Sequence, residues 1–240
     1  MNLNHLFVLL DPERFYLYIN ALFYAAFKGI LFYKLEFKGM LSLPEGTILH
    51  KHACSLSNNS VIVEIGCYGG LSTAYLLSGL NNTSTVYSID PFNKDIDFQT
   101  KAVLKGSNSI YKQQELISLN DKPNKKDVEI ALKRKGFSRF TLLQDYSFNV
   151  IKNWYRKIDL LWIDGNHEYN QVRKDFLQWS PFLKKGKVIV FHDANKTSAN
   201  SNWDMGWDGP TRVVNENIVQ PKWINIRKID SMVYATKNYG

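Results

Sequence analysis

The sequence predicts an α/β fold in which a mostly parallel sheet carries helices on both faces. Short apolar segments of strand length alternate with helical patterns along most of the 240 residues, and this alternation is typical of a parallel sheet. A glycine-rich turn directly follows the first of these segments, and two further apolar segments lie near the end of the chain. We therefore expect five parallel strands, two closing strands and a helical extension at the N-terminus.

The expected strands are short, apolar and rich in β-branched residues. The five parallel ones are Val61–Ile65, Thr85–Ile89, Arg139–Leu143, Ile158–Ile163 and Lys187–Phe191, and the closing pair is Lys222–Arg227 and Ser231–Thr236. Before the fifth strand, apolar residues recur every three or four positions, which predicts an amphipathic helix. They are Tyr169, Val172, Phe176, Trp179 and Leu183. We expect Lys184, Lys185 and Gly186 to end this helix, because cations and glycine favour helix C-termini.

The chain length fits one large domain with helical additions. We expect a helical N-terminal extension over 1–55 and a ligand-binding domain over 56–240. Within that domain, residues 93–136 are interpreted as an insertion and 195–210 as a substrate loop rich in Asn, Ser, Trp and Gly.

The composition is typical of a globular protein, with 45% hydrophobic and 22% charged residues. Two cysteines form neither a disulfide framework nor a metal-ligand spacing, so a reducing, cytoplasmic setting is expected. Much of the net charge of +8 comes from Lys94 to Arg139, which holds eleven basic and six acidic residues. Aromatic residues are not regularly spaced among these charges, so this stretch is interpreted as a solvated surface and no nucleic-acid partner is expected.

The segment from Phe15 to Tyr33 is strongly apolar and aromatic, although Asn20 and Lys28 interrupt it. Two interpretations remain open. Its helices could cover the main domain or pair two subunits of a homo-oligomer, or they could touch a membrane surface.

The most informative motif is the glycine-rich turn that runs from Glu64 to Thr73. A strand, a glycine turn and a helix in this order present backbone N–H groups to a nucleotide-like ligand. Gly66 and Gly70 would allow a close backbone approach. Asp90 ends the next strand, where a carboxylate can accept hydrogen bonds from ribose hydroxyls.

These residues spell E-x-G-x-x-x-G-x-S, which resembles motif I of the class I S-adenosylmethionine-dependent methyltransferases. The resemblance implies a Rossmann-like methyltransferase sheet with an antiparallel last strand, and S-adenosyl-L-methionine as cofactor. It also implies that the cofactor contacts Glu64, Gly66, Cys67, Tyr68, Gly70, Ser72, Asp90, Asp145, Ser147 and Asp164. Three roles stay open. Glu64 could orient the turn or meet the methionine ammonium group. Asp145 and Ser147 could contact adenine or cap a helix.

A second block reads I-D-G-N-H-E-Y from Ile163 to Tyr169 and leads to F-H-D at Phe191 to Asp193. It resembles a methyltransferase branch common in polysaccharide and small-molecule biosynthesis. The resemblance covers residues 41–237 except 93–136, and it implies a catalytic centre of Asp164, His167, His192 and Asp193. Asp164 and Asp193 could hold Mg²⁺, although Ala194 stands where the catechol-type enzymes have an Asn ligand. Without a metal, His167 or His192 would be the general base.

We expect O-methylation of a sugar hydroxyl on a glycan or a glycosylated small molecule. Trp203 and Trp207, in the loop after Asp193, offer indole faces for stacking on a sugar. The alternative is a lid whose tryptophans pack on the protein itself. Other functions considered are methylation of a catechol-like acceptor, a nicotinamide-dependent oxidoreductase, and an RNA-binding or RNA-modifying protein on the same fold.

Overall fold

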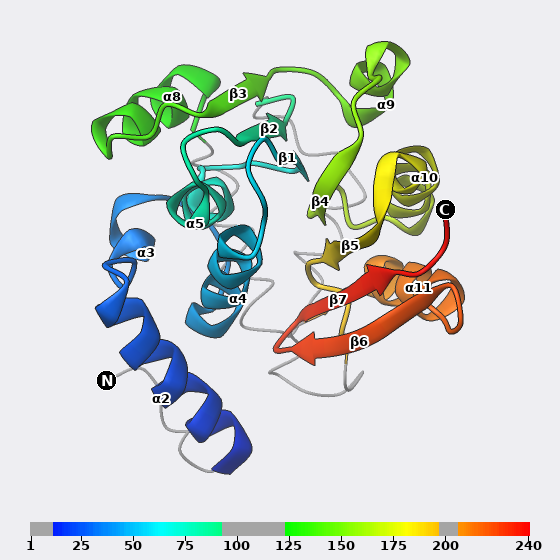
Figure 1. The fold of residues 1–240 in the computed structure, drawn as a ribbon, viewed down its shortest axis with the longest axis horizontal. Coiled ribbons are helices and arrows are strands. Elements are labelled where there is room, and N and C mark those ends of the chain that lie inside the picture. Colours follow the sequence, from blue (N-terminus) through cyan, green and yellow to red (C-terminus); the bar gives the residue numbers. More distant parts are fainter. Residues whose placement is uncertain (1–11, 93–122, 197–205) are drawn as a thin grey trace, which may run out of the picture.

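The computed structural model describes residues 12–92, 123–196 and 206–240 of the chain. These residues form a seven-stranded sheet with helices on both faces (Figure 1). The strand order is β3-β2-β1-β4-β5-β7-β6. The strands are β1 (Val61–Ile65), β2 (Thr85–Ile89), β3 (Phe140–Leu143), β4 (Ile158–Ile163), β5 (Leu183–Phe191), β6 (Trp223–Ile229) and β7 (Met232–Lys237). The first five are parallel, and β7 pairs antiparallel with both β5 and β6. The predicted fold class is therefore confirmed.

The strands of the central sheet bury both of their faces. Ile62, Leu160 and Trp162 face one apolar core, whose helices are α4 (Leu43–Cys54), α5 (Leu71–Gly79) and α8 (Lys125–Arg134). The alternate residues Val63 and Leu161 face the other core, with α10 (Tyr169–Trp179) and α11 (Asp208–Asn217). This two-sided burial explains why the strands read as continuous apolar runs.

The expected insertion over 93–136 contains an element of the domain itself. Parallel strands such as β2 and β3 need a crossover connection, and α8 lies in that connection with Val128 and Leu132 fully buried. Residues 93–122 lie outside the described residues. Most of the lysine-rich stretch that begins at Lys94 is therefore also outside them.

The helix between β4 and β5 ends earlier than its pattern predicts. Helix α10 stops at Trp179 and is followed by a 3₁₀ turn, η2 (Ser180–Phe182), where Pro181 cannot donate a helical hydrogen bond. Lys184, Lys185 and Gly186 lie in β5 and do not cap the helix, so that prediction was wrong. Gly186 has φ +77° where the pairing of β5 with β4 shifts in register.

The N-terminal part consists of α2 (Pro12–Phe27), α3 (Tyr33–Glu36) and α4. Helix α2 protrudes from the rest of the chain in Figure 1 and buries Ala21 and Ala25. Its opposite side carries Tyr16, Phe23 and Phe27, which are 71%, 72% and 84% exposed. Among the described residues, no helix combines the length and apolar character needed to cross a bilayer.

Candidate active site

The glycine-rich turn connects β1 to α5 at the carboxyl edge of the sheet. Gly66 and Gly70 have φ values of +92° and +86°, which favour glycine. A Cβ on Gly66 would lie 1.9 Å from the carbonyl oxygen of Asp164, so this glycine allows the loops after β1 and β4 to touch. A Cβ on Gly70 would instead meet Val128 of α8 at 3.0 Å. Both glycines therefore serve close packing within the protein.

Asp90, at the end of β2, holds this turn in place. Its Oδ2 accepts hydrogen bonds from the backbone N–H groups of Cys67 and Tyr68, at 3.1 and 2.8 Å. Its Oδ1 accepts from the N–H of Phe92 at 2.7 Å, and the residue is 3% exposed. The N–H groups of Cys67 and Tyr68 therefore bond to Asp90 within the protein, and this carboxylate fixes the conformation of the turn.

Glu64 supports the turn from inside the protein. It is fully buried, and its carboxylate accepts hydrogen bonds from the hydroxyl groups of Ser72, Thr73 and Ser88. Burial raises the pKa of Glu64 to about 7, although the three hydroxyl groups oppose this rise. Of the two roles left open by the sequence, the structure shows that Glu64 orients the turn. Ser72 likewise points to Glu64.

Asp145 and Ser147 lie in the loop after β3 and at the start of the short helix α9 (Ser147–Val150). Asp145 is exposed, and its Oδ1 accepts from the Tyr146 N–H and the Asn149 amide at 2.7 and 2.9 Å. Ser147 donates a hydrogen bond to Asp175 of α10. The N-cap residue is Tyr146, without a side-chain cap, so neither Asp145 nor Ser147 is the N-cap.

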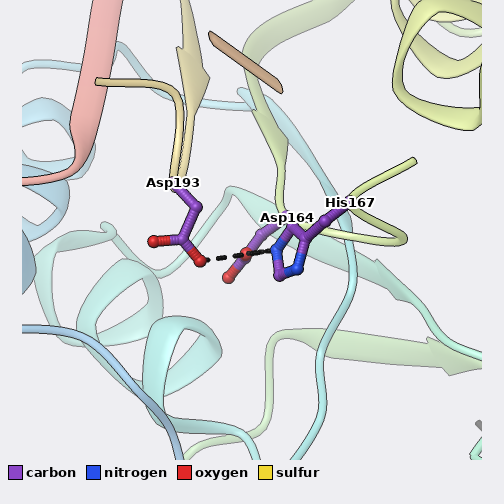
Figure 2. A group of neighbouring side chains, drawn as sticks. All are labelled: Asp164, His167 and Asp193. Carbon is purple, nitrogen blue, oxygen red and sulfur yellow. Dashed lines mark ion pairs between the residues drawn. The ribbon is translucent and has the colours of Figure 1, made fainter. Parts of the chain in front are cut away.

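Three predicted catalytic side chains come together at the ends of β4 and β5. Figure 2 shows Asp164, His167 and Asp193 turned toward one another. The Nε2 atom of His167 lies 3.4 Å from Asp193 Oδ2 and 3.9 Å from Asp164 Oδ1. Their side chains are 12–21% exposed, although the Nε2 atom of His167 is itself buried between them. The sequence prediction that these strand ends form one cluster agrees with this geometry.

His192, the fourth predicted catalytic residue, lies behind this cluster and is only 4% exposed. Its Nδ1 is 3.0 Å from Asp164 Oδ1 and 3.4 Å from Asp193 Oδ2. Burial alone would lower the pKa of His192, but Asp164, Asp193 and Glu45 raise it well above its ordinary value. His192 in turn lowers the pKa values of both aspartates against the effect of burial. The buried imidazolium therefore stabilises two neighbouring carboxylates in their charged form.

The backbone and an indole ring fix the orientation of the cluster. Asp193 has φ +51°, a left-handed backbone conformation. This conformation is energetically unfavourable for any residue other than glycine and is often found at functional sites. The N–H of Trp207 donates to the carbonyl oxygen of Asp193 at 2.8 Å. The Trp207 ring stacks on His167 with a centroid separation of 4.8 Å and is largely buried. Trp203 lies outside the described residues.

A metal ion would find three possible ligands here, because donor atoms of Asp164, His167 and Asp193 all lie within 4.8 Å of one another. The donor set fits Mg²⁺ poorly for two reasons. Mg²⁺ prefers oxygen ligands, whereas one donor is an imidazole nitrogen. The oxygen atoms of both aspartates that face His167 also lie within 3.4 Å of the imidazolium of His192, which already supplies a positive charge.

The structure adds one residue to the site that sequence reasoning missed. Glu45 lies in the first turn of α4 and is 1% exposed, and its Oε2 lies 3.6 Å from Nε2 of His192. A sequence signal was present, since Ser42 and Glu45 have the spacing of a capping box. That signal predicts only a helix start, and the contact with His192, 147 residues later, depends on the tertiary fold.

Comparison with known proteins places the chain among methyltransferases. It matches the family described as methyltransferase domain over residues 63–194, which is more than half of the chain. A curated relative, the protein y4gI of Sinorhizobium fredii, is 47% identical over 36 residues. This match spans 15% of the chain and only 4% of that protein's length.

Several solved structures share the fold at low sequence identity. A protein from Corynebacterium glutamicum has a TM-score of 0.58 and 16% identity, with 99% of this chain and 96% of that chain covered. The O-methyltransferase TomG from Streptomyces achromogenes, crystallised with S-adenosylmethionine, gives 0.58 and 16%, with 91% and 90% covered. An O-methyltransferase from Bacillus cereus gives 0.53 and 15%, with 82% of each chain covered. Together with the family match over residues 63–194, the geometry leads to one conclusion: the chain belongs to the methyltransferase domain family.

Proposed function

We propose that this protein transfers a methyl group from S-adenosylmethionine to a hydroxyl oxygen, and that His167 is the general base. The observation that carries the proposal is the partly exposed cluster of Asp164, His167 and Asp193 beside the glycine-rich turn. Membership in the methyltransferase domain family supports the reaction class. Two proteins of the same fold, TomG and the Bacillus cereus enzyme, are described as O-methyltransferases with bound S-adenosylmethionine and its demethylated product, respectively.

The residues at the carboxyl edge fit this methyl donor. In sheets of this kind, nucleoside ligands bind beside the loop that follows the first strand. Asp90 ends β2 beside that loop and holds it through Oδ2. We assign Oδ1, which accepts from the N–H of Phe92, as the acceptor for the ribose hydroxyls. When bound, S-adenosylmethionine supplies an electrophilic methyl group. The chain contributes the orientation of the reactants and a base for the acceptor hydroxyl.

His167 suits the role of base better than His192 does. A base must be able to accept a proton, and His192 already carries one, because Asp164, Asp193 and Glu45 raise its pKa well above the ordinary value. The side chain of His167 is also the more exposed of the two, at 12% against 4%. As the acceptor oxygen attacks the methyl carbon, the hydroxyl proton passes to the imidazole of His167, whose Nε2 faces the carboxylates of Asp193 and Asp164. Asp193, at 3.4 Å, then stabilises the resulting imidazolium. The carbon–sulfur bond breaks in the same displacement, and the neutral thioether leaves.

For the acceptor we propose a sugar hydroxyl, on a glycan or a glycosylated small molecule. The proposal rests on the resemblance to the branch with the I-D-G-x-H and F-H-D motifs, and on the position of the 195–210 loop directly after Asp193.

Trp207 of this loop is mostly buried on His167, so we assign it the role of holding the base in place. Trp207→Ala is therefore expected to lower kcat more than it raises KM for the acceptor.

The test combines binding with a screen of acceptors. Isothermal calorimetry should detect binding of S-adenosylhomocysteine to the protein. After incubation with S-adenosylmethionine, mass spectrometry should find a gain of one methyl group, about 14 Da, on a sugar-containing acceptor. Methylation of catechols but no sugars would contradict the acceptor class. An absence of cofactor binding would contradict the reaction itself. Activity lost with a chelator and restored by Mg²⁺ would replace the histidine base with a metal mechanism.

A further inference from the structure

The N-terminal helix α4 reaches the candidate active site through Glu45. Its Oε1 accepts hydrogen bonds from the N–H and the hydroxyl of Ser231, at 3.0 and 2.7 Å. Its Oε2 accepts from the Ser42 N–H at 2.8 Å and faces Nε2 of His192 at 3.6 Å. The carboxylate is therefore fixed by three hydrogen bonds with one oxygen directed at His192.

His192 is consequently held on both sides of its ring. Nδ1 faces Asp164 and Asp193, and Nε2 faces Glu45. A ring with carboxylate oxygens at both nitrogens has one preferred position, because rotation would remove the contacts on both sides. Without Glu45, Nε2 of His192 would lie in the protein interior with no acidic partner, which is unfavourable for a charged ring.

We propose that Glu45 is a positioning residue for methyl transfer: it holds His192 so that Nδ1 keeps the carboxylates of Asp164 and Asp193 in place around His167. The inference rests on the proposed function, since the reaction requires His167 to be aligned. It goes beyond that function because it gives the capping residue of an N-terminal helix a role in the chemical step.

A second set of contacts links this arrangement to the outermost helix. The hydroxyl of Ser42, which caps α4 with Glu45, donates to Asp230 Oδ2 at 2.6 Å. Tyr18 and Arg14 of α2 bond to the same carboxylate, at 3.2 and 3.3 Å. The N-terminal helices are thus part of the scaffold that fixes the catalytic cluster.

The test compares Glu45→Gln with a matched control, Asp159→Asn. Asp159 is also a buried carboxylate, 2% exposed, and binds Lys184 at 2.9 Å. It lies at the other end of β4 from Asp164, so its loss affects stability but not the cluster. We expect Glu45→Gln to lower kcat by about 10²-fold, the loss typical of a displacement of about 1 Å. In Glu45→Gln, the Kd for S-adenosylhomocysteine and the KM for the acceptor should stay within about threefold of the wild-type values. The kcat of Asp159→Asn should also stay within about threefold of wild type, measured at a temperature where both variants are folded.

A ¹⁵N NMR spectrum of the histidine rings provides a readout that does not depend on activity. The Nε2 resonance of His192 should shift in Glu45→Gln and stay in place in Asp159→Asn. An unchanged resonance, or a kcat equal to that of Asp159→Asn, would contradict the role of Glu45. If the wild-type protein methylates no acceptor, the proposed function fails, and the resonance still decides whether Glu45 positions His192.

Discussion

The wild-type protein is expected to lose unfolding free energy as the pH rises from 5 to 8, and replacing Glu64 with glutamine is expected to remove this loss. Glu64 is fully buried, and burial raises its pKa from the ordinary 4.5 to about 7. The folded state therefore binds the proton more tightly than the unfolded chain does. This contribution to stability is fully present below the unfolded pKa and is lost as the pH rises through about 7.

The size of the effect follows from the shift in pKa. A rise from 4.5 to about 7 corresponds to roughly 3 kcal/mol in all, at about 1.4 kcal/mol per pKa unit. About 2–3 kcal/mol of this should appear between pH 5 and pH 8. Glutamine cannot ionise, and its carbonyl oxygen can still accept from the hydroxyl groups of Ser72, Thr73 or Ser88.

Urea denaturation of both proteins at several pH values measures the effect. The difference in unfolding free energy between wild type and Glu64→Gln should fall by about 2–3 kcal/mol from pH 5 to pH 8. Glu129, whose side chain is partly exposed, provides the control, because Lys133 lowers its pKa and Glu129→Gln should not reproduce this fall. Parallel stability curves for wild type and Glu64→Gln would refute the view that burial keeps Glu64 protonated near neutral pH.

Three further predictions follow from the site and the N-terminal helix. Asp164→Asn should abolish turnover while calorimetry shows nearly unchanged affinity for S-adenosylhomocysteine; a variant that keeps its turnover would remove Asp164 from the catalytic cluster. Gly66→Ala should lower the melting temperature and weaken cofactor binding, because the new Cβ would lie 1.9 Å from a carbonyl oxygen. Gly186→Ala, with a similar φ but no heavy atom within 4 Å, should cost only the backbone strain of about 1–2 kcal/mol, and equal effects of the two changes would contradict the packing argument. Light scattering should find that the wild-type protein is a dimer and that the double variant Phe23→Ser/Phe27→Ser is a monomer, since these two exposed side chains form an apolar face on α2. A wild-type monomer that binds liposomes would favour the membrane interpretation.

The fold was predictable because its signals are local. Each parallel strand is a short apolar run, and the alternation with helices determines the sheet type. The end of α10 was mispredicted, because lysines and a glycine next to an apolar residue resemble a helix cap. Pro181 and the pairing of Leu183 with Ile158 decide the boundary instead, and strand pairing cannot be read from local sequence.

The cluster of Asp164, His167 and Asp193 was predictable for a similar reason. Asp164 and Asp193 each follow a buried strand, and the carboxyl ends of adjacent parallel strands meet at one edge. The hydrogen bonds by which Glu64 and Asp90 hold the glycine-rich turn were harder to predict, because they join segments that are distant in the sequence. Asp90, for example, accepts from the N–H groups of Cys67 and Tyr68.

The most direct test of the proposed reaction is the transfer of a labelled methyl group from S-adenosylmethionine to a panel of sugar-containing acceptors, with wild type and His167→Ala compared side by side. The account predicts that wild type places the label on a hydroxyl oxygen and that His167→Ala loses about 10²–10⁴-fold in kcat, the usual contribution of a general base. It also predicts that His167→Ala still binds S-adenosylhomocysteine. A His167→Ala variant that transfers the label at the wild-type rate would contradict the assignment of the base, and a wild-type protein that binds no cofactor would contradict methyl transfer itself.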